Sequence, residues 1–142
     1  MLKSLVVAAM AVVIATGLSF ADQSESKVVI PVGKTAANNG KQMYTSYCAP
    51  CHGTDGRGNG PAATALKNQP TDLTALARNN HGKYPDSHVY EVLQFGADIP
   101  AHGSAEMPVW GKILANMNRA NTQEKDLRMS NLTRYVESIQ VK

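Results

Sequence analysis

The sequence predicts a small all-α domain, and two observations support this class. Near the C-terminus, apolar and aromatic residues recur at the i, i+3, i+4, i+7 spacing of one helix face. These residues are Leu132, Tyr135, Val136 and Ile139. The sequence also has no alternating run of apolar and polar residues long enough for a useful strand, and no internal repeat. We therefore expect helices and connecting loops, without a sheet.

The first expected helix covers residues 37–47, with Gly40 and Tyr44 one turn apart on a shared face. A glycine-rich stretch follows at residues 53–61, which cannot continue a helix. Pro61 suits the first turn of a short helix over residues 60–67, because the missing N–H has no partner there in any case.

Three more helices complete the expected fold. One short helix covers residues 72–78, and the next begins at an Asp86 or Ser87 cap and ends at Gly96. The inward-facing residues of that second helix are Val89, Val92 and Leu93. The last helix carries the apolar stripe, and Asn121 with Glu124 forms a plausible capping arrangement at its start.

The most informative motif is Cys48-Ala49-Pro50-Cys51-His52. Cys-x-x-Cys-His is the spacing at which two thiols can form thioethers with a haem while the following histidine lies beneath the iron. Imidazole is a good iron ligand, and the two thioethers keep the ring next to it in both oxidation states. The motif predicts covalent haem attachment through Cys48 and Cys51, with His52 as a ligand.

Three other interpretations compete for these residues. A disulfide gives His52 no role, and a zinc site needs further ligands although the chain has only 2 cysteines. The stronger rival is a thioredoxin-like dithiol, since Tyr47-Cys48-Ala49-Pro50-Cys51 has an aromatic-Cys-x-Pro-Cys pattern. Such a pair opens a long helix, whereas the glycines after His52 prevent one here.

Met107 is the best candidate for the second axial ligand. It lies in a loop context, where Pro108 fixes the backbone beside the thioether and Trp110 offers a flat ring to pack near the porphyrin. Three other methionines lie in helical patterns that indicate core packing, namely Met43, Met117 and Met129.

Together, the Cys-x-x-Cys-His motif, the Met107-Pro108 pair about fifty residues later and the terminal amphipathic helix resemble a class I monohaem c-type cytochrome. The stretch 102–111 is similar to a bacterial periplasmic branch, and the resemblance covers nearly all of the chain after Ala37. It implies one covalent haem c, with helices wrapped around it and the first and last helices crossing. The positions that match the family's crossing contact are Gly40, Tyr44, Leu132 and Tyr135.

The resemblance also implies a carbonyl partner for the haem-ligand histidine, and Pro61 in Gly58-Asn59-Gly60-Pro61 matches that family segment. Three histidines remain as alternative axial ligands. His81 and His88 are expected to be solvated or locally hydrogen-bonded, because turns and helix starts are usually exposed. His102 is the stronger alternative, since it is only five residues from Met107.

Residues 1–21 predict a secretory signal peptide: Lys3 precedes an apolar stretch from Leu5 to about Leu18 and a small-residue end. An apolar stretch of about fourteen residues is short for an uncleaved membrane anchor. We therefore expect a periplasmic protein without stable membrane insertion after cleavage. The expected organisation is a signal peptide at 1–21, a short extension at 22–36 and a cytochrome c domain at 37–142.

With His52 and Met107 both bound, iron has no free position for a substrate, which favours an electron carrier or an electron-accepting subunit of a periplasmic oxidoreductase over an enzyme. We expect redox proteins such as a dehydrogenase or oxidase as partners, no nucleic acid, and a monomer or one subunit of a complex. The net charge of +3 is small. A gas sensor or haem enzyme with an open distal site, and a thiol-disulfide oxidoreductase, remain alternatives.

Overall fold

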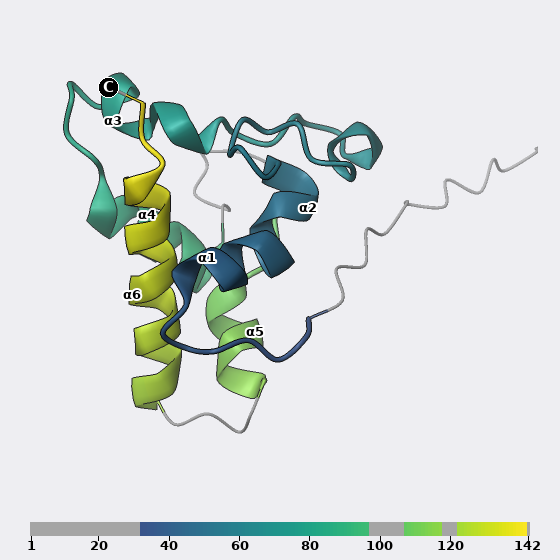
Figure 1. Cartoon of the computed structure of the whole chain (residues 1–142), viewed down its shortest axis with the longest axis vertical. Helices are drawn as coiled ribbons and strands as arrows, with labels where there is room; N and C mark the ends of the chain where they lie inside the picture. Colours follow the sequence, from purple (N-terminus) through teal and green to yellow (C-terminus); the bar gives the residue numbers. More distant parts are fainter. Residues whose placement is uncertain (1–31, 97–106, 118–121, 142) are drawn as a thin grey trace, which may run out of the picture.

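The computed structural model describes residues 32–96, 107–117 and 122–141. The expected signal peptide, His102 and the Asn121 cap lie outside these residues. The elements in chain order are α1 (Gly40–Met43), the π-helical η1 (Tyr44–Cys48), α2 (Ala49–His52), the 3₁₀ turns η2 (Ala63–Ala65) and η3 (Leu73–Ala75), α3 (Leu76–Asn79), α4 (Asp86–Phe95), α5 (Trp110–Asn116) and α6 (Thr122–Ser138) (Figure 1). The described part of the chain contains no strand, so the all-α prediction is confirmed.

The first helical stretch is longer at its C-terminal end than predicted. The Asn39 side chain accepts a 2.9 Å hydrogen bond from the Gln42 N–H and caps the helix, so it begins at Gly40 rather than at residue 37. It then continues through the cysteine motif to His52, where it was expected to stop. A proline inside an α-helix clashes with the carbonyl one turn earlier, and the wider π-helical turn before Pro50 gives it room.

The first helix crosses α6 at close range, as Figure 1 shows for α1. A Cβ at Gly40 would overlap the Asn131 carbonyl oxygen and lie 3.0 Å from Tyr135 Cβ. One turn later, the Tyr44 and Tyr135 rings pack with their centroids 5.0 Å apart. The predicted crossing is therefore confirmed at these positions, and glycine is required because only a residue without a side chain allows two backbones to approach so closely.

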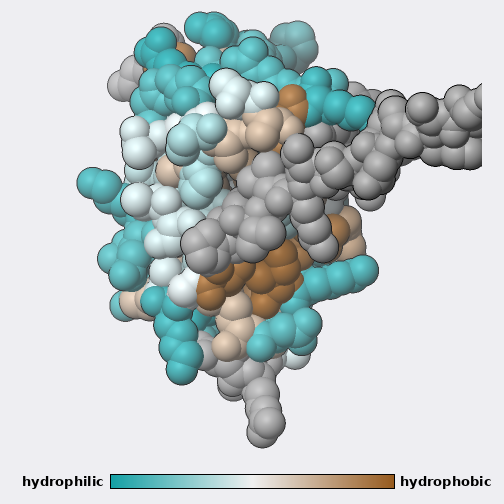
Figure 2. Space-filling model, turned by 90° about the vertical axis from the view of Figure 1, so that its right-hand side faces the viewer, coloured by the Kyte–Doolittle hydropathy of each residue, from teal (hydrophilic) through white to brown (hydrophobic). Residues whose placement is uncertain are grey.

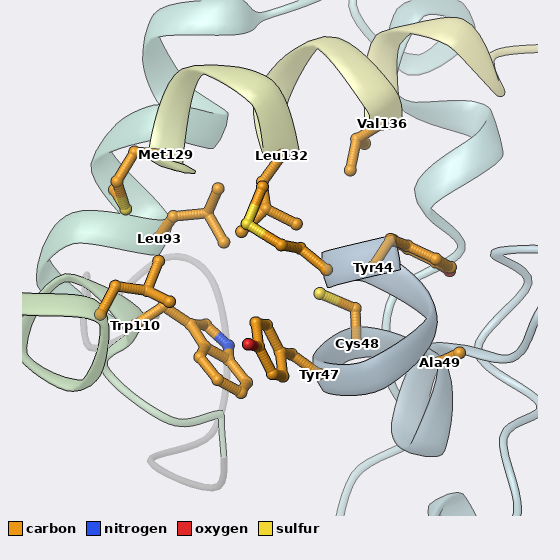
Figure 3. Packing of buried hydrophobic residues seen from close by; sticks show 11 residues of the cluster. Tyr44, Tyr47, Cys48, Ala49, Leu93, Trp110, Met129, Leu132 and Val136 are labelled. Atoms are coloured by element: carbon orange, nitrogen blue, oxygen red, sulfur yellow. The ribbon is translucent and has the colours of Figure 1, made fainter. Parts of the chain in front are cut away.

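The core lies where the first helix, α4, α5 and α6 meet (Figure 3). Its largest fully buried side chains are Tyr44, Tyr47, Met43, Leu114, Met129 and Leu132. Met43 and Met129 are core residues as predicted, and Met117 packs against the same cluster. The C-terminal stripe is also confirmed, with Leu132 and Val136 buried and Ile139 half-buried. These four helical segments hold the walls of the site described below.

Two further predictions about helix limits were wrong. Over residues 60–67, only the turn Ala63–Ala65 is helical, because the chain there hydrogen-bonds back to the end of the first helix through the Ala62 N–H and Pro50 carbonyl. At α4, Pro85 occupies the cap position and no side chain caps the helix, although Asp86 in the first turn still favours the N-terminal end of the dipole. The stop at Gly96 is confirmed, with φ of 91°.

On the face shown in Figure 2, a group of hydrophobic side chains lies among hydrophilic ones. Among the described residues, Phe95 is the most exposed large hydrophobic side chain, at 70%. No helix in the described ranges combines the length and the apolar character needed to cross a membrane.

The crossing yields a stability prediction. Gly40→Ala should lower the free energy of unfolding by about 1–3 kcal/mol, because the new methyl group would force α6 away. Gly33→Ala is the matched control: its Cβ would meet nothing within 4 Å, and the change should stay within about 0.5 kcal/mol. Urea unfolding of the holoproteins measures both, and equal midpoints would contradict the tight crossing.

Candidate haem site

A cavity of about 250 Å³ opens between the first helix, the 66–76 segment, α4, α5 and α6. All four predicted site residues line it: Cys48, Cys51, His52 and Met107. Most of the remaining lining is apolar or aromatic, and comprises Tyr47, Leu66, Pro70, Leu73, Leu76, Val89, Val92, Leu93, Pro108, Trp110, Leu132 and Val136. The polar residues of the lining are Asn68, Gln69, Thr71 and His88. The cavity thus joins parts of the chain that are about sixty residues apart.

The end of the first helix is fixed by the glycine-rich loop that follows it. Gly58 N–H donates to the His52 carbonyl at 2.8 Å, and Gly60 N–H donates to the Cys51 carbonyl at 3.0 Å. These bonds satisfy carbonyls that a helix C-terminus otherwise leaves without partners. The glycines that argued against a thioredoxin-like helix therefore have a positive role here, because they hold the cysteine motif in place.

The His52 ring has a fixed orientation. Its Nδ1 lies 3.0 Å from the Thr71 carbonyl oxygen, which can only accept, so Nδ1 carries the proton and Nε2 keeps its lone pair. Burial lowers the pKa of His52, which favours the neutral imidazole that a metal requires. The expected carbonyl partner, Pro61, is wrong: the loop brings the Thr71 carbonyl to the ring instead.

The two thiols do not have the environment of a redox-active pair. Burial, and then the neighbouring Cys51, raise the pKa of Cys48 to about 12, and burial also raises the pKa of Cys51. A reactive dithiol needs a lowered thiol pKa, usually from a helix N-terminus, whereas Cys48 ends a π-helical turn within a continuing helix. Both cysteines are free and no disulfide joins them. The geometry therefore disfavours the thioredoxin-like interpretation.

Met107 reaches the cavity from the segment just before α5. Pro108 and Trp110 line the same cavity, as expected from their positions beside Met107. Trp110 is 2% exposed and stacks on Tyr47, with ring centroids 5.4 Å apart and planes 25° from parallel (Figure 3). The methionine segment is thus anchored against the helix that carries the cysteines.

The alternative histidines divide into three cases. His81 is exposed in a turn, with a positive φ of 54°, as expected. His88 is not the exposed side chain that its helix-start position suggests, because it is half-buried and lines the cavity. Its position at the start of α4 suggested exposure, but α4 turns this face toward the cavity. His102 lies outside the described residues.

Sequence reasoning missed two features of the site. Thr71 contributes a backbone carbonyl, and no side-chain pattern indicates where a carbonyl will point. Tyr47 forms part of the cavity wall and stacks on Trp110. Its position beside Cys48 is the available signal in the sequence.

These residues fit a covalently bound haem: two thiols, a neutral imidazole with a free Nε2, and a thioether all face one largely apolar cavity. The helical fold with this site defines a c-type cytochrome. Residues 35–121 match the family model described as cytochrome c oxidase, cbb3-type, subunit III, and the chain belongs to this family. It is therefore an electron-transfer haem protein with covalently bound haem c. Neither the curated proteins nor the solved structures gave a match.

Two glycines with positive φ allow the effect of backbone strain to be measured separately from the effect of the tight contact in the loop after His52. Gly58 and Gly82 both have positive φ, 78° and 83°, so alanine strains both by about 1–2 kcal/mol. A Cβ at Gly58 would also overlap the Pro70 carbonyl oxygen next to Thr71, whereas at Gly82 it meets nothing within 4 Å. Gly58→Ala should therefore lower the free energy of unfolding by about 1–3 kcal/mol more than Gly82→Ala does, as measured by denaturant unfolding. Equal costs would show that the loop contact is unimportant.

Proposed function

We propose that this protein is a periplasmic single-electron carrier, or the electron-accepting cytochrome c subunit of a periplasmic oxidoreductase. In this proposal, Cys48 and Cys51 attach one haem c, and His52 and Met107 are its axial ligands. The observation that carries the proposal is the cavity, which gathers these four side chains from two distant parts of the chain. When bound, haem c supplies reversible one-electron transfer at its iron.

The residues around the cavity suit electron transfer better than substrate chemistry. His52 offers a neutral Nε2 because its other nitrogen is held by the Thr71 carbonyl. Met107 offers a soft thioether, and an apolar lining disfavours additional positive charge; both favour the ferrous state and raise the reduction potential. With both ligands in place, no coordination position stays open, so we propose that the protein has no substrate site of its own.

The proposed partners are redox proteins. The family is described as a subunit of a cytochrome oxidase, which supports an oxidase or another respiratory enzyme as the partner. The predicted signal peptide supports export to the periplasm. Size-exclusion chromatography of the native protein from its periplasmic fraction distinguishes a diffusible carrier, which would elute as a monomer, from a subunit, which would elute with a larger complex.

Covalent attachment yields the most direct test. The mature wild-type chain should have the mass of the polypeptide plus one haem, and acidified acetone should not extract the haem. Cys48→Ala or Cys51→Ala leaves one thioether at most and should sharply lower the holoprotein yield. His52→Ala should destroy the native coordination. A wild-type mass equal to the bare chain, or to the bare chain minus two hydrogens, would reject haem attachment.

The axial assignment predicts a contrast among methionines. Met107→Ala should let CO bind to the ferrous protein and should lower the reduction potential, because the thioether is lost. Met129→Leu is the matched control: Met129 is fully buried and does not line the cavity, and a volume-conserving core substitution is tolerated. A wild-type ferric protein without the near-infrared methionine-to-iron band would contradict the assignment, and His88→Ala and His102→Ala would then test the other candidates.

A further inference from the structure

A short segment before the first helix is tied to the wall of the cavity by side-chain hydrogen bonds. We call residues 33–35 the N-terminal strap. Tyr47 Oη donates to the Gly33 carbonyl oxygen at 2.6 Å and lies 2.7 Å from Thr35 Oγ1. Thr35 Oγ1 also accepts a 3.1 Å hydrogen bond from Arg128 Nη1 of α6. The strap thus connects the first helix with the last one.

The direction of these hydrogen bonds follows from their chemistry. A tyrosine hydroxyl has one proton, and the Gly33 carbonyl can only accept, so Tyr47 gives its proton to Gly33. Thr35 must then donate to Tyr47, and Thr35 accepts from Arg128, which can only donate. The order is therefore Arg128 to Thr35 to Tyr47 to Gly33, and bonds in such a chain polarise and strengthen one another.

The hydrogen-bond chain starts at the buried guanidinium of Arg128. Arg128 is only 2% exposed, and its guanidinium also donates to Glu124 Oε1 at 2.8 Å. A further contact joins its Nη1 to Met43 Sδ at 3.8 Å. A buried guanidinium is costly unless its donors are satisfied, so Arg128 requires the Thr35 hydroxyl as a partner. This requirement fixes the strap on the domain.

Tyr47, the third member of this hydrogen-bond chain, reaches the cavity. Tyr47 is 1% exposed, lines the cavity and stacks on Trp110, which is three residues after Met107 (Figure 3). α5 also packs closely on α4 at Gly111. A Cβ at Gly111 would overlap the Gln94 carbonyl oxygen of α4. α5 also packs on α6. Of these contacts that hold the methionine segment, we assign the strap to the one made by the Tyr47 ring.

We propose that Thr35 and Arg128 are positioning residues that, through Tyr47 and Trp110, keep Met107 at the haem iron. The proposal rests on the proposed function for the identity of the ligand. The strap holds the Tyr47 ring in place, and this ring packs on Trp110 in the first turn of α5. The first turn of α5 in turn holds the methionine segment that precedes it. Loosening the strap therefore raises the fraction of molecules in which Met107 has left the iron.

The test uses the complete holoprotein and measures how tightly imidazole binds to the ferric iron, because imidazole binds only when the methionine leaves. Thr35→Val and Tyr47→Phe each remove two hydrogen bonds of this network. Each should raise the apparent imidazole affinity at least about tenfold, the effect expected from the loss of even one buried hydrogen bond. Thr35→Ser keeps the hydroxyl and should match the wild type. Tyr84→Phe is a control for stability alone: it removes a 2.9 Å bond to the Thr133 carbonyl, and Tyr84 does not line the cavity.

A second measurement does not depend on the ligand. Hydrogen exchange at the amides of α5 should be faster in Thr35→Val and Tyr47→Phe than in Tyr84→Phe, with α6 as the internal reference. The proposal is overturned if the two strap variants behave like Tyr84→Phe in both measurements. If the wild type lacks the methionine-to-iron band, the ligand assignment fails instead, and exchange in α5 alone decides whether the strap positions this segment.

Discussion

The close packing of the first helix on α6 at Gly40 is the contact on which the rest of the structure depends. The helix runs without interruption from Gly40 to His52, so its crossing point also sets the position of the cysteine motif. A displacement at the crossing would move Cys48 and His52 relative to Leu132 of α6, which also lines the cavity. The π-helical turn before Pro50 preserves this continuity, because a proline in a regular helix would bend or end it.

The interior of this small domain contains a cavity, whereas the interior of a larger domain is filled by more buried side chains. Several of its inward-facing side chains, such as Leu93 and Val136, pack in the core and line the cavity at the same time. A small domain buries only a limited fraction of its surface, so a large apolar cofactor contributes much of the missing interior. We therefore expect bound haem to stabilise the folded domain, because the same residues line the cavity and pack in the core.

The two sides of the cavity are held in different ways. On the cysteine side, a continuous helix and a loop of backbone hydrogen bonds fix His52, whose ring is oriented by the Thr71 carbonyl. The methionine side has no comparable loop of backbone hydrogen bonds among the described residues. It is held through α5, whose Trp110 stacks on Tyr47, whose Gly111 packs closely on α4 and which also packs on α6. Aromatic stacking is weaker than a covalent attachment, which makes Met107 the more easily displaced of the two proposed ligands.

The sequence by itself determined the fold class, the C-terminal stripe and the haem attachment motif, because helix periodicity and Cys-x-x-Cys-His spacing are local patterns. Tertiary structure decided the carbonyl partner of His52, the inward position of His88 and the Tyr47–Trp110 stack. These features depend on how the 53–72 loop folds back and on the rotation of α4 and α5. Segments far apart in the chain meet there through backbone carbonyls and ring faces, for which the sequence of either segment contains no periodic signal.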